Sequence, residues 1–183
     1  MTIDKDIANC IYTGIMTDTG SFRFRSTTST THRVIANLID IGIDNAKIHQ
    51  NVYDSNSYNR LQLLGKSLNN LKVIPELNTA YITLSKDEQN EFNAQKGYTE
   101  GVVNYALSLK GIKLAAIFKE DQTSGLIKIS FRSKGDFSVN ELSRLHFNGG
   151  GHTNAAGGAS KLSLKDTIKK FISILPNYIR DLS

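Results

Sequence analysis

Three stretches of the sequence carry residues that could act on a phosphate group, and the first is T-D-T-G-S-F-R. It contains the carboxylate of Asp18 and the guanidinium of Arg23 where a predicted helix gives way to a loop. An aspartate oxygen is a hard ligand that suits Mn²⁺ or Mg²⁺, and an arginine can donate two parallel hydrogen bonds to a phosphate. The same residues could simply form a helix-terminal turn, so this stretch alone does not indicate a site.

The second stretch is rich in glycine, F-N-G-G-G-H-T-N-A-A-G-G. Gly149, Gly150 and Gly151 lack Cβ atoms, so their backbone N–H groups could approach an anion in a concave nest. His152 adds a ring donor and Asn154 an amide. The spacing matches neither the Walker A pattern nor G-x-G-x-x-G, so nucleotide folds of those types are not supported. We expect an anion-binding loop, and a flexible glycine linker is the alternative.

The third stretch, I-S-F-R-S-K-G, ends a predicted strand. Alternation along the strand puts Arg132 on the face opposite to Ser133. An arginine that projects from a strand end beside the glycine-rich segment could clamp a phosphate. A solvated charge on an edge strand is the alternative.

Helical periodicity dominates the first part of the chain. The sequence predicts a helix from residue 3 to about residue 17, and a second through residues 34–39 that the Ser/Thr tract before it caps. Further helices are predicted at residues 44–52 and 58–71, the last with Leu61, Leu64, Leu68 and Leu71 on its buried face.

The pattern changes after residues 73–79, and strands then alternate with helices. Strands are predicted at residues 80–84, 114–118 and 126–131, and helices after the capping residues Ser85 and Ser138 and over residues 102–107. Ser163 begins a last helix, whose predicted inward residues are Ile168, Phe171, Ile172 and Leu175. We therefore predict an α/β protein with a boundary between residues 1–76 and 77–183.

Composition sets broad limits on function. The 183 residues are 39% hydrophobic and carry a net charge of +5, which favours anionic partners without requiring them. The single cysteine, Cys10, falls in an apolar helical pattern and is predicted to be a buried thiol in a reducing compartment. No apolar run approaches the roughly 20 residues that span a bilayer, and no signal peptide is evident. We expect a cytoplasmic protein with no membrane partner.

These motifs, in the order G-I-M-T-D-T-G-S-F-R-F, I-S-F-R-S-K and G-G-G-H-T-N-A-A-G-G, resemble the DHH phosphoesterase family with its DHH-associated C-terminal domain. Within that family they are similar to the branch of bacterial oligoribonucleases and pAp phosphatases. The resemblance covers the whole chain. It implies a helical C-terminal remnant of a DHH catalytic domain at residues 1–76, followed by a small α/β DHH-associated domain with a mixed sheet at residues 77–183.

The resemblance also implies roles for individual residues. Asp18 would be catalytic, as one ligand of a centre with two Mn²⁺ ions. The expected substrate-binding residues are Arg23, Arg132, Ser133, Gly149, Gly150, Gly151, His152 and Asn154. The implied reaction is in-line attack of a metal-bound hydroxide on phosphorus, in short oligoribonucleotides and nucleoside 3′,5′-bisphosphates such as pAp.

One departure from the family pattern is large, because the sequence contains no Asp-His-His string. We therefore expect an N-terminally truncated portion that by itself holds Mn²⁺ incompletely and hydrolyses little. Two alternatives stay open: a non-catalytic module that binds phosphate or single-stranded RNA, and a cyclic-dinucleotide phosphodiesterase of the same family. Short single-stranded RNA or phosphorylated nucleotides are the expected partners, with homodimerisation left open.

Overall fold

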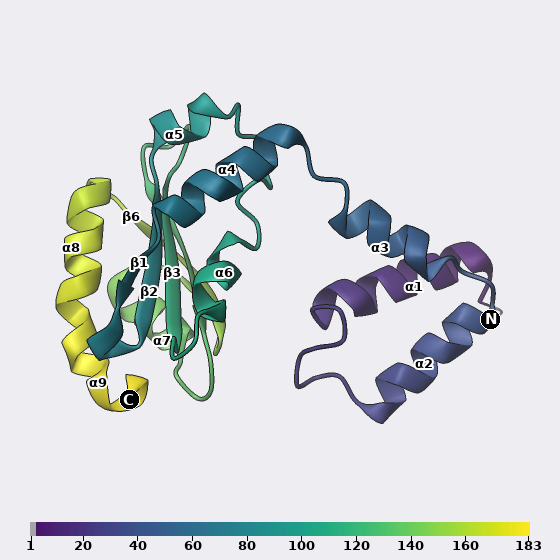
Figure 1. The fold of residues 1–183 in the computed structure, drawn as a ribbon. Helices are drawn as coiled ribbons and strands as arrows, with labels where there is room; N and C mark the ends of the chain where they lie inside the picture. The colour runs from purple at the N-terminus through teal and green to yellow at the C-terminus, as the bar shows by residue number, and fades with distance from the viewer. Residues whose placement is uncertain (1–2) are drawn as a thin grey trace. The chain divides into compact units, whose positions relative to one another are not determined.

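A computed structural model describes residues 3–183 and divides the chain into two compact units, Met1–Asn56 and Ser57–Ser183 (Figure 1). Helix α4 (Tyr58–Asn69) belongs with the second unit by its contacts. Its Leu64 packs against a buried cluster of the sheet, and the Ser57 hydroxyl just before it donates to the Tyr98 hydroxyl at 2.8 Å. Packing thus divides the chain earlier than the predicted domain boundary after residue 76, which stays a prediction about domain identity.

The first unit is helical, as predicted, with α1 (Lys5–Asp18), α2 (Ser29–Asp40) and α3 (Asn45–Tyr53). A side chain accepts a backbone N–H at each N-cap, and these caps are Asp4, Thr28 and Asp44. The buried face of α1 consists of Ala8, Tyr12 and Met16, four residues apart. Cys10 lies off this face and is exposed, so the prediction of a buried thiol was wrong.

The second unit is built on a six-stranded sheet in the order β1-β2-β3-β4-β6-β5. Strands β2 and β3 are parallel and every other neighbouring pair is antiparallel, which confirms the mixed sheet. The strands are β1 (Lys72–Ile74), β2 (Thr79–Leu84), β3 (Leu114–Glu120), β4 (Ile127–Ser133), β5 (Gly150–His152) and β6 (Ala155–Ser160).

Further helices surround the sheet: α5 (Lys86–Glu91), α6 (Val102–Ser108), α7 (Val139–His146), α8 (Leu164–Ile174) and α9 (Ile179–Leu182). Short 3₁₀ turns occur at Pro75–Leu77 and Leu175–Tyr178. The predicted capping box of Ser85 and Glu88 is present at the start of α5. Within the described part of the chain, no helix combines the length and apolar character needed to cross a membrane.

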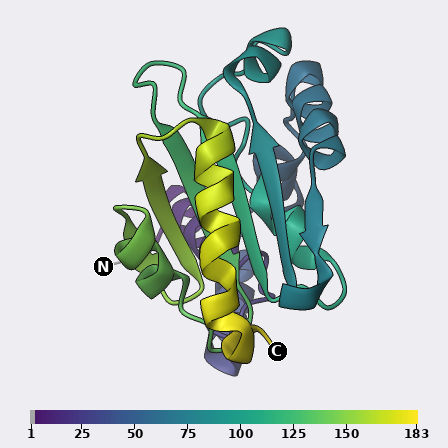
Figure 2. The same ribbon diagram turned by 90° about the vertical axis from the view of Figure 1, so that its left-hand side faces the viewer.

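Different helices cover the two faces of the sheet. Helices α7 and α8 cover one face, and Figure 2 looks onto it with α8 (yellow) lying in front of the strands. Phe118, Phe131 and Phe171 are fully buried there, each contributing about 1.5–3 kcal/mol. Helices α4 and α6 lie on the other face, over β2 and β3 (Figure 1). Residues of β4 and β6 on that second face are exposed or only half-buried.

Two helices turn slightly different faces inward than the sequence predicts. On α4, Leu63 is fully buried while Leu61 is 50% exposed and Leu68 is 38% exposed. The buried stripe includes Ser67, whose hydroxyl donates to the Leu63 carbonyl at 2.8 Å, so a polar residue joins the core without an unpaired group. Phe171 on α8 and Leu175 just after it are buried as predicted, but Ile172 on α8 is 40% exposed.

The turn between β3 and β4 is held by one carboxylate. Asp121 accepts hydrogen bonds from the backbone N–H of Ser124 at 2.8 Å and of Thr123 at 3.2 Å, and from both hydroxyls. Its second oxygen lies 2.5 Å from the Lys128 ammonium. Lys128, and then these turn hydrogen bonds, hold the pKa of Asp121 far below its ordinary value.

We expect Asp121→Asn to lower the free energy of unfolding at pH 7, and to lower it less at acid pH. A depressed folded-state pKa contributes stability above the unfolded pKa of about 3.9, and this stability declines as the pH falls toward the folded pKa. Urea unfolding of the wild type and the variant at pH 7 and near pH 3 measures the gap between their free energies of unfolding. Asp136→Asn is the control, because the Asp136 carboxylate accepts no hydrogen bond from residues 3–183. A gap that is the same at both pH values would contradict this prediction.

Candidate functional site

Strand register places two of the predicted site residues in one cross-strand row. Arg132 on β4 is opposite Ala155 on β6, and Ala155 is opposite His152 on β5. Residues directly opposite one another in antiparallel strands share a face of the sheet. Arg132 and His152 are therefore two strands apart, about 10 Å between backbones, with only a methyl group between them. The His152 side chain is exposed, so it is open to a ligand.

Arg132 carries a charge without an acidic partner. Its side chain is half-buried, and its Nη1 donates to the Phe131 carbonyl at 2.9 Å. Of the salt bridges formed by residues 3–183, none involves this guanidinium. Burial lowers the pKa of Arg132, although an arginine stays protonated in proteins. A partly desolvated cation with free N–H groups is suited to binding an anion.

The glycine-rich segment forms a β-hairpin, not the open loop that the sequence suggests. Strand pairing joins Gly150 to Gly157 and Gly151 to Ala156. The Gly151 N–H donates to the Asn140 side chain at 2.9 Å, and the Gly149 N–H to the Ser143 carbonyl at 3.3 Å. These two N–H groups are thus used within the fold and do not form an anion nest. A substrate-binding role for the three glycines stays a prediction.

Asn154 and Ser133 fasten the hairpin to the end of β4. The Asn154 amide donates to the Ser133 hydroxyl at 3.0 Å and to the Gly135 carbonyl at 2.9 Å. The buried Ser133 hydroxyl in turn donates to the Phe137 carbonyl at 2.6 Å. These contacts fix the turn that follows His152. Direct substrate contact by Asn154 or Ser133 stays a prediction.

Asp18 and Arg23 belong to the first unit. Asp18 is the last residue of α1 and is exposed, and the Arg23 Nε donates to the Gly20 carbonyl at 2.7 Å. Residues 3–183 contain no group of three or more His, Cys, Asp or Glu side chains arranged to hold a metal ion. A centre with two Mn²⁺ ions needs several such ligands, so the side chains described do not fit it.

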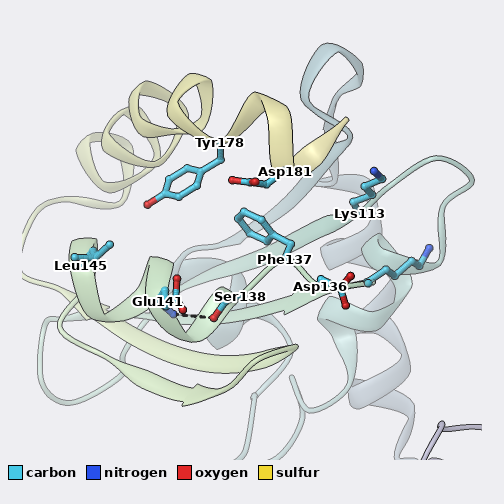
Figure 3. Close-up of a pocket in the computed structure, with 10 residues that line it drawn as sticks. Lys113, Asp136, Phe137, Ser138, Glu141, Leu145, Tyr178 and Asp181 are labelled. Carbon is cyan, nitrogen blue, oxygen red and sulfur yellow. Dashed lines mark hydrogen bonds between the residues drawn. The ribbon is translucent and has the colours of Figure 1, made fainter.

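Two surface hollows bear on where a phosphate could bind, and the larger of these two is not suited to it. It has a volume of about 580 Å³ and is shown in Figure 3. Asp136, Glu141 and Asp181 line it together with two lysines, and these carboxylates would repel an anion. Burial, followed by the charges of Glu141 and Asp181, raises the pKa of Tyr178 in its wall.

The smaller hollow, of about 360 Å³, has a different character, and we name it the basic hollow. It lies between the turn before α6 and strands β3, β4 and β6, and no acidic side chain is among the described residues that line it. Its polar lining consists of Thr99, Lys119, Lys128 and Ser130, beside the backbone of Gly157. The sequence motifs do not single out these residues, although alternation along β4 puts Lys128 and Ser130 on the same face as Arg132.

Comparisons with known proteins agree on one group of relatives. The DHHA1 domain matches residues 77–181. The bifunctional oligoribonuclease and PAP phosphatase NrnA of Bacillus subtilis is 30% identical over 157 residues, which are 86% of this chain and 48% of that protein. The solved structure of an exopolyphosphatase-related protein from Bacteroides fragilis is 42% identical with a TM-score of 0.94, covering 98% of this chain and 52% of that one.

A more distant solved structure shares the fold alone. The pGpG-specific phosphodiesterase PggH from Vibrio cholerae is 17% identical with a TM-score of 0.52, over 94% of this chain and 55% of that one. The chain therefore spans about half the length of the relatives it matches.

Proposed function

The chain belongs to the DHHA1 domain family, and from that premise we propose that its second unit binds a phosphate of a nucleotide or short single-stranded RNA through Arg132 and His152. The observation that carries the proposal is the cross-strand row in which these two residues lie, with an alanine between them. Arg132 supplies a partly desolvated charge that no salt bridge of the described chain neutralises. Such a group can bind phosphate in a bidentate manner.

We further propose that this binding serves a phosphoesterase that acts on short oligoribonucleotides and on pAp. The name of the Bacillus subtilis relative supports both substrates. Within the proposal, Arg132 orients the phosphate and offsets its charge, and His152 donates a hydrogen bond to it. A binding module without turnover is the competing function, because the described residues present no metal-binding cluster.

A binding measurement tests the proposal. We expect the full chain to bind AMP equally well in EDTA and in Mn²⁺, within about twofold, because the contacts come from Arg132 and His152. Affinity should fall as salt rises, since the interaction is largely ionic. Calorimetric titration in the two buffers gives both results. No binding of AMP in either buffer, or binding in Mn²⁺ alone, would refute the proposed phosphate site.

A turnover measurement separates the two functions. Incubation of the chain with a short RNA and Mn²⁺, followed by chromatography, detects released mononucleotides. Binding with release supports the phosphoesterase. Binding without release supports the non-catalytic module for this chain, because the phosphate site does not require the catalytic groups.

A further inference from the structure

The basic hollow contains two lysines that lie opposite each other on neighbouring strands. Lys119 on β3 is directly opposite Lys128 on β4. Like charges in this arrangement destabilise a sheet unless something compensates for them. Asp121 compensates Lys128. Lys119 is half-buried and donates to the Thr99 hydroxyl at 2.8 Å, and no carboxylate within residues 3–183 forms a salt bridge with it.

Keeping the ammonium of Lys119 charged in this position therefore costs free energy, and an anion bound in the hollow would reduce that cost. Burial, followed by the nearby charge of Lys128, lowers the pKa of Lys119, while Asp121 acts in the opposite direction. An anion in the hollow would favour the charged form of this lysine. The Ser130 hydroxyl lines the same hollow and offers a neutral donor.

Gly157 keeps the hollow open. A Cβ atom added there would meet no atom nearer than the Ile129 carbonyl, at 3.7 Å, so packing does not require glycine at this position. Its neighbour Gly158 projects to the other face, where an added Cβ would approach the Phe147 Cβ at 2.9 Å. Gly158 is thus explained by packing, whereas a side chain at Gly157 would fill space in the hollow.

The hollow lies next to the proposed phosphate site along the strands. Ser130 is opposite Gly157, in the row of residues two positions before that of Arg132 on β4. Rows two residues apart are separated by about 7 Å, which is about the reach of one nucleotide. Lys119 lies one row farther, opposite Lys128 and about 14 Å along the strands from the row of Arg132, but its long side chain lines the same hollow as Ser130. A ligand whose first phosphate contacts Arg132 could therefore place a second phosphate beside Ser130, in the hollow that Lys119 also lines.

We infer that the basic hollow is a second phosphate subsite, in which Lys119 and Ser130 hold the second phosphate of a nucleoside bisphosphate or of a short RNA, and the missing side chain of Gly157 leaves room for it. This inference rests on the proposed phosphate site at Arg132 and His152. It assigns a preference, because ligands with two phosphates should bind better than those with one.

Calorimetry with AMP and adenosine 3′,5′-bisphosphate tests this preference. We expect the full chain to bind the bisphosphate about tenfold more tightly than AMP, as one charge-assisted hydrogen bond implies. Lys119→Met keeps most of the apolar stem and should bring this ratio close to one. The control Lys165→Met removes an equal charge from α8, on the other face, and should leave the ratio at about ten. A 5′-phosphorylated diadenylate in place of the bisphosphate shows whether a backbone phosphate is accepted.

A second variant fills the hollow without removing charge. Gly157→Val suits a strand and should also bring the ratio close to one, with thermal unfolding used to confirm that it is folded. A Lys119→Met ratio equal to that of the wild type would overturn the subsite. An equal ratio in the Lys165→Met variant and the Lys119→Met variant, both reduced, would also overturn it, because the effect would then be general electrostatics.

Failure of the underlying phosphate site looks different in the same experiment. Arg132→Lys should weaken binding of both ligands and keep their ratio. If Arg132→Lys changes neither affinity, the proposed function is wrong, whatever Lys119→Met does. If Arg132→Lys weakens both and Lys119→Met leaves the ratio unchanged, only the second subsite is wrong.

Discussion

Arg132→Ala is expected to lower the affinity for AMP about 100-fold, because it removes two charge-assisted hydrogen bonds from a partly desolvated site. The guanidinium is half-buried, and its hydrogen bond to the Phe131 carbonyl holds it close to the sheet. A phosphate bound there loses less energy to competition from water than one bound at an exposed arginine. Isothermal titration of both proteins at one salt concentration measures the change.

Two further variants sharpen this expectation. Arg132→Lys keeps the charge but not the planar pair of donors, so its affinity for AMP should lie between those of the alanine variant and the wild type. Arg180→Ala on α9 is the matched control, because it removes an equal charge from an exposed helix turn. Equal losses in the Arg132→Ala and Arg180→Ala variants would mean that net charge, not a site, attracts the nucleotide.

Local signals in the sequence predict most of the secondary structure. Side chains at Thr28, Ser85 and Ser138 accept backbone N–H groups at the helix starts where the sequence places caps. These contacts involve residues three apart, so the information is local. The two apolar runs on either side of Gly125 likewise predict the β3–β4 hairpin, since short turns join neighbouring antiparallel strands.

Features set by distant partners are not predicted in the same way. Leu61 and Leu68 belong to the predicted apolar stripe of α4 and Leu63 does not, but the position of α6 and β2 decides that Leu63 is the leucine that is fully buried. The candidate site shows the same limit. Arg132 and His152 are recognisable as single residues, but their common row depends on β6 pairing with both β4 and β5. No local pattern reports that register.

Substitutions in the glycine-rich segment test whether its glycines are needed for packing or for binding a ligand. Gly149→Ala is expected to lower the free energy of unfolding by more than about 3 kcal/mol, because overpacking against backbone cannot be relieved by a rotamer change. The added Cβ would lie 1.9 Å from the Gly157 carbonyl and 2.3 Å from the Ser143 hydroxyl. That hydroxyl already donates to the same carbonyl at 2.5 Å, so the clash would separate α7 from β6.

Gly150→Ala is the matched control for this prediction. Its added Cβ would meet only the side-chain atoms of Arg144 and Asn140, both at 3.5 Å. The free energy of unfolding should therefore change by less than about 1 kcal/mol. Urea unfolding of the two variants compares them directly. If the glycines serve chiefly to let backbone approach a ligand, both variants should be stable and both should lose AMP affinity. The hairpin geometry instead predicts one unstable variant and one stable variant, because adjacent glycines meet different neighbours.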